Sequence, residues 1–155
     1  NVLSARFGRL RIAWDNEDKL CVLLVERQVA GSNEKHYKLP GSLIYESEDL
    51  DTAAYRVLNE ATGLKRVALK QFRSFGSPAR TKNKEDVQWL ENASKMKITR
   101  IVTVAYLAFV SSEENDMGEM SDTLIWAPVN ELPHCHSTIR KLLKLPAKRY
   151  GGGWM

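Results

Sequence analysis

The chain has 155 residues, of which 43% are hydrophobic and 27% are charged. This ordinary globular composition, at this length, predicts one domain with a sizeable core rather than two large ones. The sequence shows no apolar run near the length of a membrane helix and no recognisable secretory leader, so we expect a cytoplasmic protein without a membrane partner. Its two cysteines, Cys21 and Cys135, fit a reducing compartment better than a disulfide framework.

The net charge of +4 is unevenly distributed. Residues 65–100 hold ten bases against three acids, residues 101–133 hold six acids and no base, and residues 134–155 hold five bases and no acid. Such asymmetry favours an anionic partner, with a solvated basic surface as the alternative, and we prefer that alternative for residues 65–70.

The first half of the chain begins with a predicted hairpin. Leu10 to Trp14 is typical of a strand, residues 15–18 form a polar turn, and Leu20 to Val25 is an apolar run that suits a buried strand. We expect Glu26-Arg27 to end that strand. A shorter strand at Tyr37 to Leu39 then leads into the next segment.

Residues 39–64, LPGSLIYESEDLDTAAYRVLNEATGL, predict a tight loop followed by an amphipathic helix. Pro40-Gly41 marks the loop, and acidic residues from Glu48 to Asp51 suit the positive end of a helix dipole. Gly63 marks the end of the helix. The apolar stripe that should face the core consists of Leu50, Ala54, Val57, Leu58 and Ala61.

This segment resembles a Nudix box, whose pattern would run here from Ser42 to Leu64. The residues that match the pattern, besides the entrance Leu39-Pro40-Gly41, are Glu48, Arg56, Leu58, Glu60, Gly63 and Leu64. Three positions depart from it, because Ser42 replaces a Gly while Val57 and Ala61 each replace a Glu.

The two lost glutamates decide what the resemblance implies for metal binding. Positions 57, 60 and 61 share one helical face, which in active Nudix enzymes presents carboxylates to divalent cations. Magnesium needs hard oxygen ligands, so only Glu60, helped by Glu48 from the loop, remains to hold it. We expect weak or absent magnesium binding, with Glu60 and Glu48 catalytic only if the protein is active and with Arg56 as structural support.

After the box, Val67 to Phe75 predicts a strand that ends at Gly76-Ser77-Pro78. The Nudix family usually places substrate contacts in this neighbourhood, so the resemblance makes Phe75 and Arg80 candidate ligand-binding residues. An arginine can hold phosphate in a bidentate manner, and an aromatic ring can stack on a base or sugar. The alternative is that Phe75 belongs to the core.

Residues 82–97 resemble an insertion with a short helix, which would cover the site or pack a dimer through Trp89. Ile101 to Val110 predicts a strand covered on both faces, and Thr123 to Trp126 predicts another after a polar loop. Residues 126–133 resemble the segment that commonly ends a Nudix domain, which places the domain at residues 1–136.

Residues 137–155 form a basic tail with a predicted short helix. Pieces of it faintly resemble the winged-helix domain that follows the Nudix domain in Nudix-related transcriptional regulators, but the segment is too short to be that domain. His134-Cys135-His136 lacks the ligand spacing of known zinc sites, so we do not expect a metal there.

The segments ALKQFRSFG and RIVTVAYLAF are particularly similar to those regulators. The resemblance implies a Nudix-type α/β/α sandwich with a mixed sheet, and the order of predicted elements agrees. It also implies a homodimer that binds a nucleotide-sugar, NAD-related or sugar effector and contacts DNA through a winged-helix element. The competing function is a magnesium-dependent hydrolase of nucleoside diphosphate linked compounds, for which Glu46, Glu48 and Asp49 would rebuild the metal site. Val57 and Ala61 favour the sensor.

Overall fold

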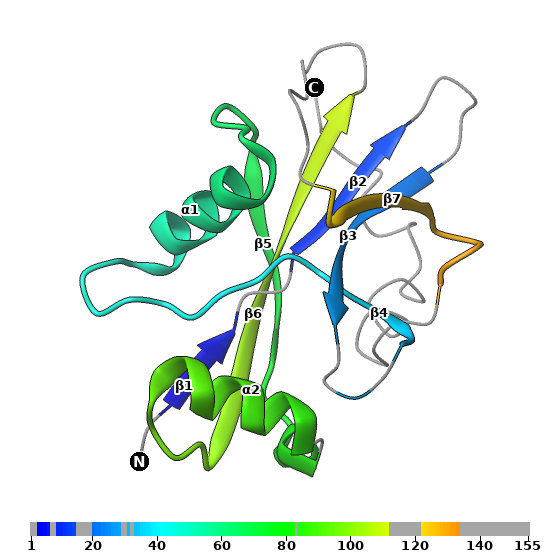
Figure 1. Cartoon of the computed structure of the whole chain (residues 1–155). Coiled ribbons are helices and arrows are strands. Elements are labelled where there is room, and N and C mark those ends of the chain that lie inside the picture. Colours follow the sequence, from blue (N-terminus) through cyan, green and yellow to red (C-terminus); the bar gives the residue numbers. More distant parts are fainter. Residues whose placement is uncertain are drawn as a thin grey trace.

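The computed structural model describes residues 3–6, 9–14, 20–28, 31, 33–82, 84–111 and 122–133 (Figure 1). The elements run in the order β1 (Leu3–Arg6), β2 (Arg9–Trp14), β3 (Leu20–Gln28), β4 (Lys35–Lys38), α1 (Leu50–Thr62), β5 (Leu69–Phe75), the 3-10 helix η1 (Pro78–Lys82), α2 (Lys84–Ser94), β6 (Arg100–Ser111) and β7 (Leu124–Pro128). Neither α-helix of this described part combines the length and the apolarity that a membrane span requires.

The strands form one mixed sheet around β6, in the order β1-β6-β2-β3-β4, with β5 on β6 and β7 on β3. β1 and β2 run parallel to β6, whereas β5 runs antiparallel to it. Tyr106 pairs with Arg9 of β2 and with Gln71 of β5, so these strands lie on opposite edges of β6. The two helices and this mixed sheet confirm the predicted α/β class.

The predicted hairpin is confirmed, because β2 and β3 pair antiparallel. The predicted end of the second strand at Glu26-Arg27 was wrong, since β3 includes both residues and continues to Gln28. Its last residues stay extended because they pair with β4, where Glu26 lies opposite Tyr37 and Gln28 opposite Lys35. β1 was not predicted from the sequence.

Both faces of β6 are covered, as its apolar sequence predicts. Val104 and Tyr106 pack against Ala53 and Ala54 of α1, and the alternate residues Ala105 and Leu107 lie in a second cluster. That cluster also contains Val22, Leu24, Leu39 and Ala127. The period of two in side-chain direction therefore places β6 between α1 and the core on its other face.

The helix of the box forms where its sequence predicts, with Asp49 as N-cap and Gly63 as C-cap. The Asp49 carboxylate accepts a 2.7 Å hydrogen bond from the Thr52 backbone N–H, and Gly63 adopts a φ of 70°, which favours glycine. Leu50 departs from the predicted stripe, because it begins the helix and is 38% exposed.

The predicted insertion contains a helix, α2, which packs at the end of the sheet where β6 begins (Figure 1). Leu90 is fully buried there against Ile98 and Ile101. Leu43 joins the same cluster from the box loop, which is the loop of residues 39–49 before α1. Trp89 is half-buried within the chain by this packing.

Candidate functional site

Arg56 ties the box loop to α1 and so fixes the walls of the candidate site. Its Nε donates to Glu48 Oε2 at 2.9 Å, and its Nη2 donates to the Leu43 carbonyl at 2.8 Å. Nη1 lies 3.3 Å from Glu60 Oε2 one helical turn away, and the guanidinium lies 4.0 Å from the centre of the Tyr45 ring. Through these contacts Arg56 joins the loop to the helix, and its role in supporting ligand binding stays a prediction.

The same network controls the charge state of Glu48. Hydrogen bonds from the Arg56 guanidinium hold the pKa of the Glu48 carboxyl below its ordinary value, and the pKa of Arg56 is raised in return. Both groups are therefore charged near neutral pH.

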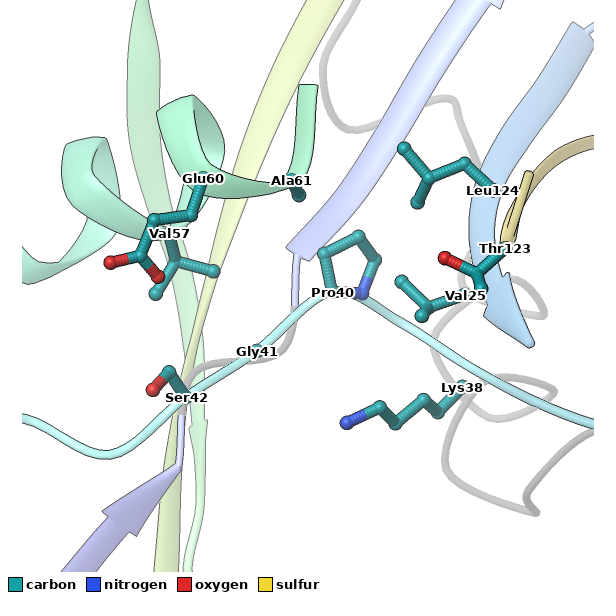
Figure 2. A pocket seen from close by; sticks show the side chains of 10 residues that line it. All are labelled: Val25, Lys38, Pro40, Gly41, Ser42, Val57, Glu60, Ala61, Thr123 and Leu124. Atoms are coloured by element: carbon teal, nitrogen blue, oxygen red, sulfur yellow. The ribbon is translucent and has the colours of Figure 1, made fainter. Parts of the chain in front are cut away.

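A cleft of about 290 Å³ lies beside this network, between α1 and the neighbouring ends of β3 and β7 (Figure 2). The chain between β4 and α1 crosses it at Pro40 to Ser42. Its complete lining is Val25, Lys38, Pro40, Gly41, Ser42, Val57, Glu60, Ala61, Thr123 and Leu124.

The floor of the cleft comes from one row across three strands. Lys38 of β4 lies opposite Val25 of β3, and Val25 lies opposite Leu124 of β7. Directly opposed residues share one face of a sheet, so these three side chains lie together although they are far apart in the sequence. Tyr37 and Leu39 pack in the core cluster on the other face.

The helix wall of the cleft consists of Val57, Glu60 and Ala61, the helical face on which the Nudix pattern expects carboxylates. Val57 is only 3% exposed, so an apolar side chain fills the position of the first missing carboxylate. Figure 2 shows the side chains of Val57 and Glu60 next to each other on α1.

These residues do not fit a magnesium ion. Glu60 is the carboxylate of the lining, and it already pairs with Arg56, while the ammonium of Lys38 supplies positive charge to the same cleft. In the described ranges no three His, Cys, Asp or Glu side chains gather as a metal-binding group. Magnesium requires near-octahedral oxygen ligands, which this lining does not provide.

The structure separates the predicted site residues. Glu60 lines the cleft, whereas Glu48 is held by Arg56 and does not line it. Arg80 of η1 donates from Nη2 to Thr103 Oγ1 at 2.8 Å, and Phe75 packs against the core cluster that contains Val22 and Leu24. Neither Arg80 nor Phe75 lines this cleft, and their roles in ligand binding stay predictions. Residues 134–136 lie outside the described residues.

Sequence reasoning missed two polar residues of the cleft, Lys38 and Thr123. The signal for Lys38 was present, because it lies between Tyr37 and Leu39 in a strand, and alternation directs it away from the core that they enter. Thr123 gave no local signal, since its position depends on the pairing of β3 with β7.

A family model described as "NUDIX domain" matches residues 7–145. Comparison with curated protein sequences gives no match.

Several solved structures share the fold at low sequence identity. A mutT/nudix family protein from Listeria innocua is 21% identical, with a TM-score of 0.65 over 91% of this chain and 89% of that chain. The NUDIX domain of Shewanella oneidensis NrtR, solved with ADP ribose, is 21% identical, with a TM-score of 0.66 over 96% and 89%. Ap4A hydrolase from C. elegans is 14% identical, with a TM-score of 0.54 over 83% of each chain.

The family match covers most of the sequence, and it agrees with the box helix, its Arg56 network and the mixed sheet around β6. The chain therefore belongs to the NUDIX domain family.

Proposed function

We propose that this chain is a ligand-sensing Nudix domain of a transcriptional regulator, with little or no hydrolase activity. Its effector would be a nucleotide-sugar, an NAD-related compound or a sugar. The observation that carries the proposal is that Val57 and Ala61 line the cleft where a hydrolase needs carboxylates.

The chemistry of hydrolysis explains why this observation matters. Metal-assisted attack of water on phosphorus needs cations that neutralise the phosphate and lower the pKa of the water. Here Val57 is buried and apolar, and Ala61 offers no ligand atom. The remaining carboxylate, that of Glu60, forms an ion pair with Arg56. The cleft can enclose a ligand group but lacks the ligands for that metal chemistry.

The structural neighbours support a sensor of this kind. NrtR from Shewanella oneidensis has been solved with ADP ribose bound to its NUDIX domain and, separately, with a 27mer DNA. The chain covers 58% of the NrtR chain in the DNA complex. We infer that DNA contact by a regulator of this type would require a further element beyond the Nudix domain, and that the protein works as a dimer.

A hydrolase is the second candidate function, because Glu60 keeps its place in the cleft and one structural neighbour is an Ap4A hydrolase. Purified protein assayed with magnesium or manganese against ADP-ribose, NAD and sugar nucleotides separates the two. A sensor should turn over none of them at rates typical of enzymes, about 1 per second or faster, while binding at least one in calorimetry. Robust hydrolysis that disappears in Glu60→Gln would establish the hydrolase instead.

A further inference from the structure

Positive charge gathers along the strand β5, on the side of the sheet away from β3 and β4. In the described part of the chain β5 pairs with β6 alone, and it runs beside β6 from the loop after α1 toward α2 (Figure 1). No acid occurs in residues 61–84, whereas the bases there are Lys65, Arg66, Lys70, Arg73, Arg80, Lys82 and Lys84. We call four of these the basic edge, namely the exposed residues Lys65, Arg66, Arg73 and Lys82.

The charges of the basic edge are not compensated within the chain. Among the described residues, none of its four side chains forms an ion pair with a carboxylate, in contrast to Lys35 and Arg56. Asp51 of α1 approaches the same strands, but its carboxylate accepts a 2.6 Å hydrogen bond from the buried Tyr106 hydroxyl. Uncompensated charges of one sign produce a local positive potential that attracts anions.

The spacing of these bases suits an extended anion better than a small one. Lys65 and Arg66 precede β5, Arg73 lies within it and Lys82 ends η1 after it. The strand from Leu69 to Phe75 alone spans about 20 Å, so the four groups cannot converge on a single phosphate. A second exposed arginine, Arg100, extends the charge at the far end of β5, where its Nη2 donates to the Gly76 carbonyl at 3.0 Å.

The backbone of β5 argues against another strand as the partner. The register with β6 shifts between Gln71 and Arg73, which marks a bulge or irregularity in β5. Bulges and basic side chains are the devices that block strand addition at an open edge. A second copy of the chain pairing through β5 would also bring two basic edges together, which like-charge repulsion disfavours.

Double-stranded DNA meets these requirements. One DNA strand presents a phosphate about every 3.4 Å along the axis, so 20 Å of duplex offers several phosphates to separate bases. Sites for single strands usually add aromatic rings on which bases stack. Here Phe72 and Phe75 of β5 pack against the core cluster instead, which favours the duplex.

We propose that the basic edge contacts the phosphate backbone of double-stranded DNA without reading its sequence. The inference rests on the proposed function, because DNA is the macromolecule on which a transcriptional regulator acts. Reading of bases is left to the further element inferred above, and the basic edge adds contacts that position the Nudix domain on the duplex. A solvated surface without a partner, which the sequence favoured for residues 65–70, is the alternative that the experiment tests.

Fluorescence anisotropy with labelled duplexes of two unrelated sequences tests the proposal on the full chain, over about 50–200 mM salt. The variant of the basic edge is Lys65→Gln with Arg66→Gln and Arg73→Gln. Arms with single-stranded DNA and with polyglutamate identify the kind of anion. Thermal unfolding shows whether the variant is folded, and calorimetry with ADP-ribose shows whether its effector binding is intact.

The matched control removes three bases from the other basic run of the chain, in residues 134–155. Lys141→Gln with Lys144→Gln and Lys148→Gln changes the net charge by the same amount as the variant of the basic edge. The two triple variants therefore separate the position of the charge from its quantity.

The expected result is weak binding of both duplexes, with equal dissociation constants of about 1–100 µM near physiological salt. The variant of the basic edge should weaken binding about tenfold or more at the lowest salt. Its plot of log affinity against log salt should be less steep by about 2–3 units, because each lost phosphate contact removes nearly one unit. The control variant should change affinity less than about threefold, and ADP-ribose affinity should match wild type in both.

Other results overturn the inference in distinguishable ways. Equal losses in the two triple variants would show that net charge, and not the basic edge, holds the DNA. Equal or tighter binding of polyglutamate would make an acidic protein the partner, and tighter binding of single strands would refute the duplex. Wild type that binds ADP-ribose but no DNA would leave only a solvated surface and keep the sensor function, whereas robust hydrolysis of ADP-ribose would refute the proposed function.

Discussion

Arg56 donates to both carboxylate oxygens of Glu48, from Nε to Oε2 at 2.9 Å and from Nη2 to Oε1 at 2.5 Å. Their side chains are 18% and 7% exposed, so the pair is largely shielded from water. Bidentate, charge-assisted bonds of this kind are among the stronger polar contacts in proteins. Because Glu48 precedes α1 and Arg56 lies within it, the pair fixes the box loop against the helix.

The first prediction concerns the geometry of that pair. Arg56→Lys keeps the charge but cannot contact Glu48, Leu43 and Glu60 together, so the free energy of unfolding should fall by about 1–3 kcal/mol. Chemical denaturation measures it. Arg73→Lys is the control, because Arg73 is exposed on β5 and should change stability by less than about 0.5 kcal/mol. Equal losses in both variants would mean that the bidentate contact adds nothing.

The second prediction is a pH dependence that comes from Glu48. Its pKa is lower in the folded state because Arg56 donates hydrogen bonds to the carboxylate. The resulting stabilisation is complete above the unfolded-state pKa of about 4.3 and is lost as the pH falls through the lower folded-state pKa. Glu48→Gln should therefore lose less stability than wild type between pH 7 and pH 3.

Denaturation of both proteins across this pH range provides the measurement. Asp49→Asn is a useful comparison, because the pKa of the Asp49 carboxyl is also lowered, here by hydrogen bonds from Thr52. If Glu48→Gln and wild type lose the same stability on acidification, the Arg56–Glu48 pair does not set the acid sensitivity of the fold.

Much of the fold follows from local sequence signals. Asp49 and Gly63 bracket α1 because a carboxylate caps a helix start and glycine tolerates the left-handed geometry after its end. The continuous apolar sequence of β6 likewise reveals its two covered faces. β1 escaped prediction because a four-residue strand carries little periodicity, and its pairing partner, β6, lies about 100 residues away.

The cleft was less predictable than the fold. The box pattern correctly placed Val57, Glu60 and Ala61 on one wall, because helical spacing is a local property. The floor joins Lys38, Val25 and Leu124, whose proximity depends on strand register between distant segments. Alternation within the strand directs Lys38 away from the core, but no pattern within either segment specifies that register. The position of Lys38 beside Val25 and Leu124 was therefore visible only in the structure.

The third prediction restores the missing carboxylates. Val57→Glu with Ala61→Glu should lower the free energy of unfolding by about 2 kcal/mol or more without metal, because Val57 is buried and the new charge loses hydration. Magnesium should then bind more tightly than to wild type, and ten times its dissociation constant should recover about 1.4 kcal/mol. Thermal unfolding with and without magnesium measures both effects.

A matched control separates charge from size in that experiment. Val57→Gln with Ala61→Gln introduces side chains of similar volume that carry no charge, so magnesium should leave its stability unchanged. If magnesium stabilises wild type, the glutamine variant and the glutamate variant alike, the cleft is not where the metal binds.

The last prediction concerns Arg80 and Phe75, which we expected to line a ligand site. The Arg80 guanidinium is held by Thr103 at 2.8 Å, and Thr103 is a buried hydroxyl on β6. The planar fork of an arginine can hold two phosphate oxygens in a fixed direction, which a lysine ammonium cannot reproduce. Arg80→Lys should therefore weaken ADP-ribose binding in calorimetry, and Phe75→Ala should weaken it if the ring stacks on the ligand.

Two controls distinguish this role from simple structural support. Lys82→Met removes a neighbouring charge at the end of η1 and should leave affinity unchanged. Thr103→Val removes the hydroxyl that orients Arg80, so it should weaken binding less than Arg80→Lys does, because the guanidinium remains present. If Arg80→Lys and Phe75→Ala lower the unfolding temperature while affinity stays at the wild-type value, both residues serve the core and the ligand contacts lie elsewhere, with the Lys38 side of the cleft as the next surface to test.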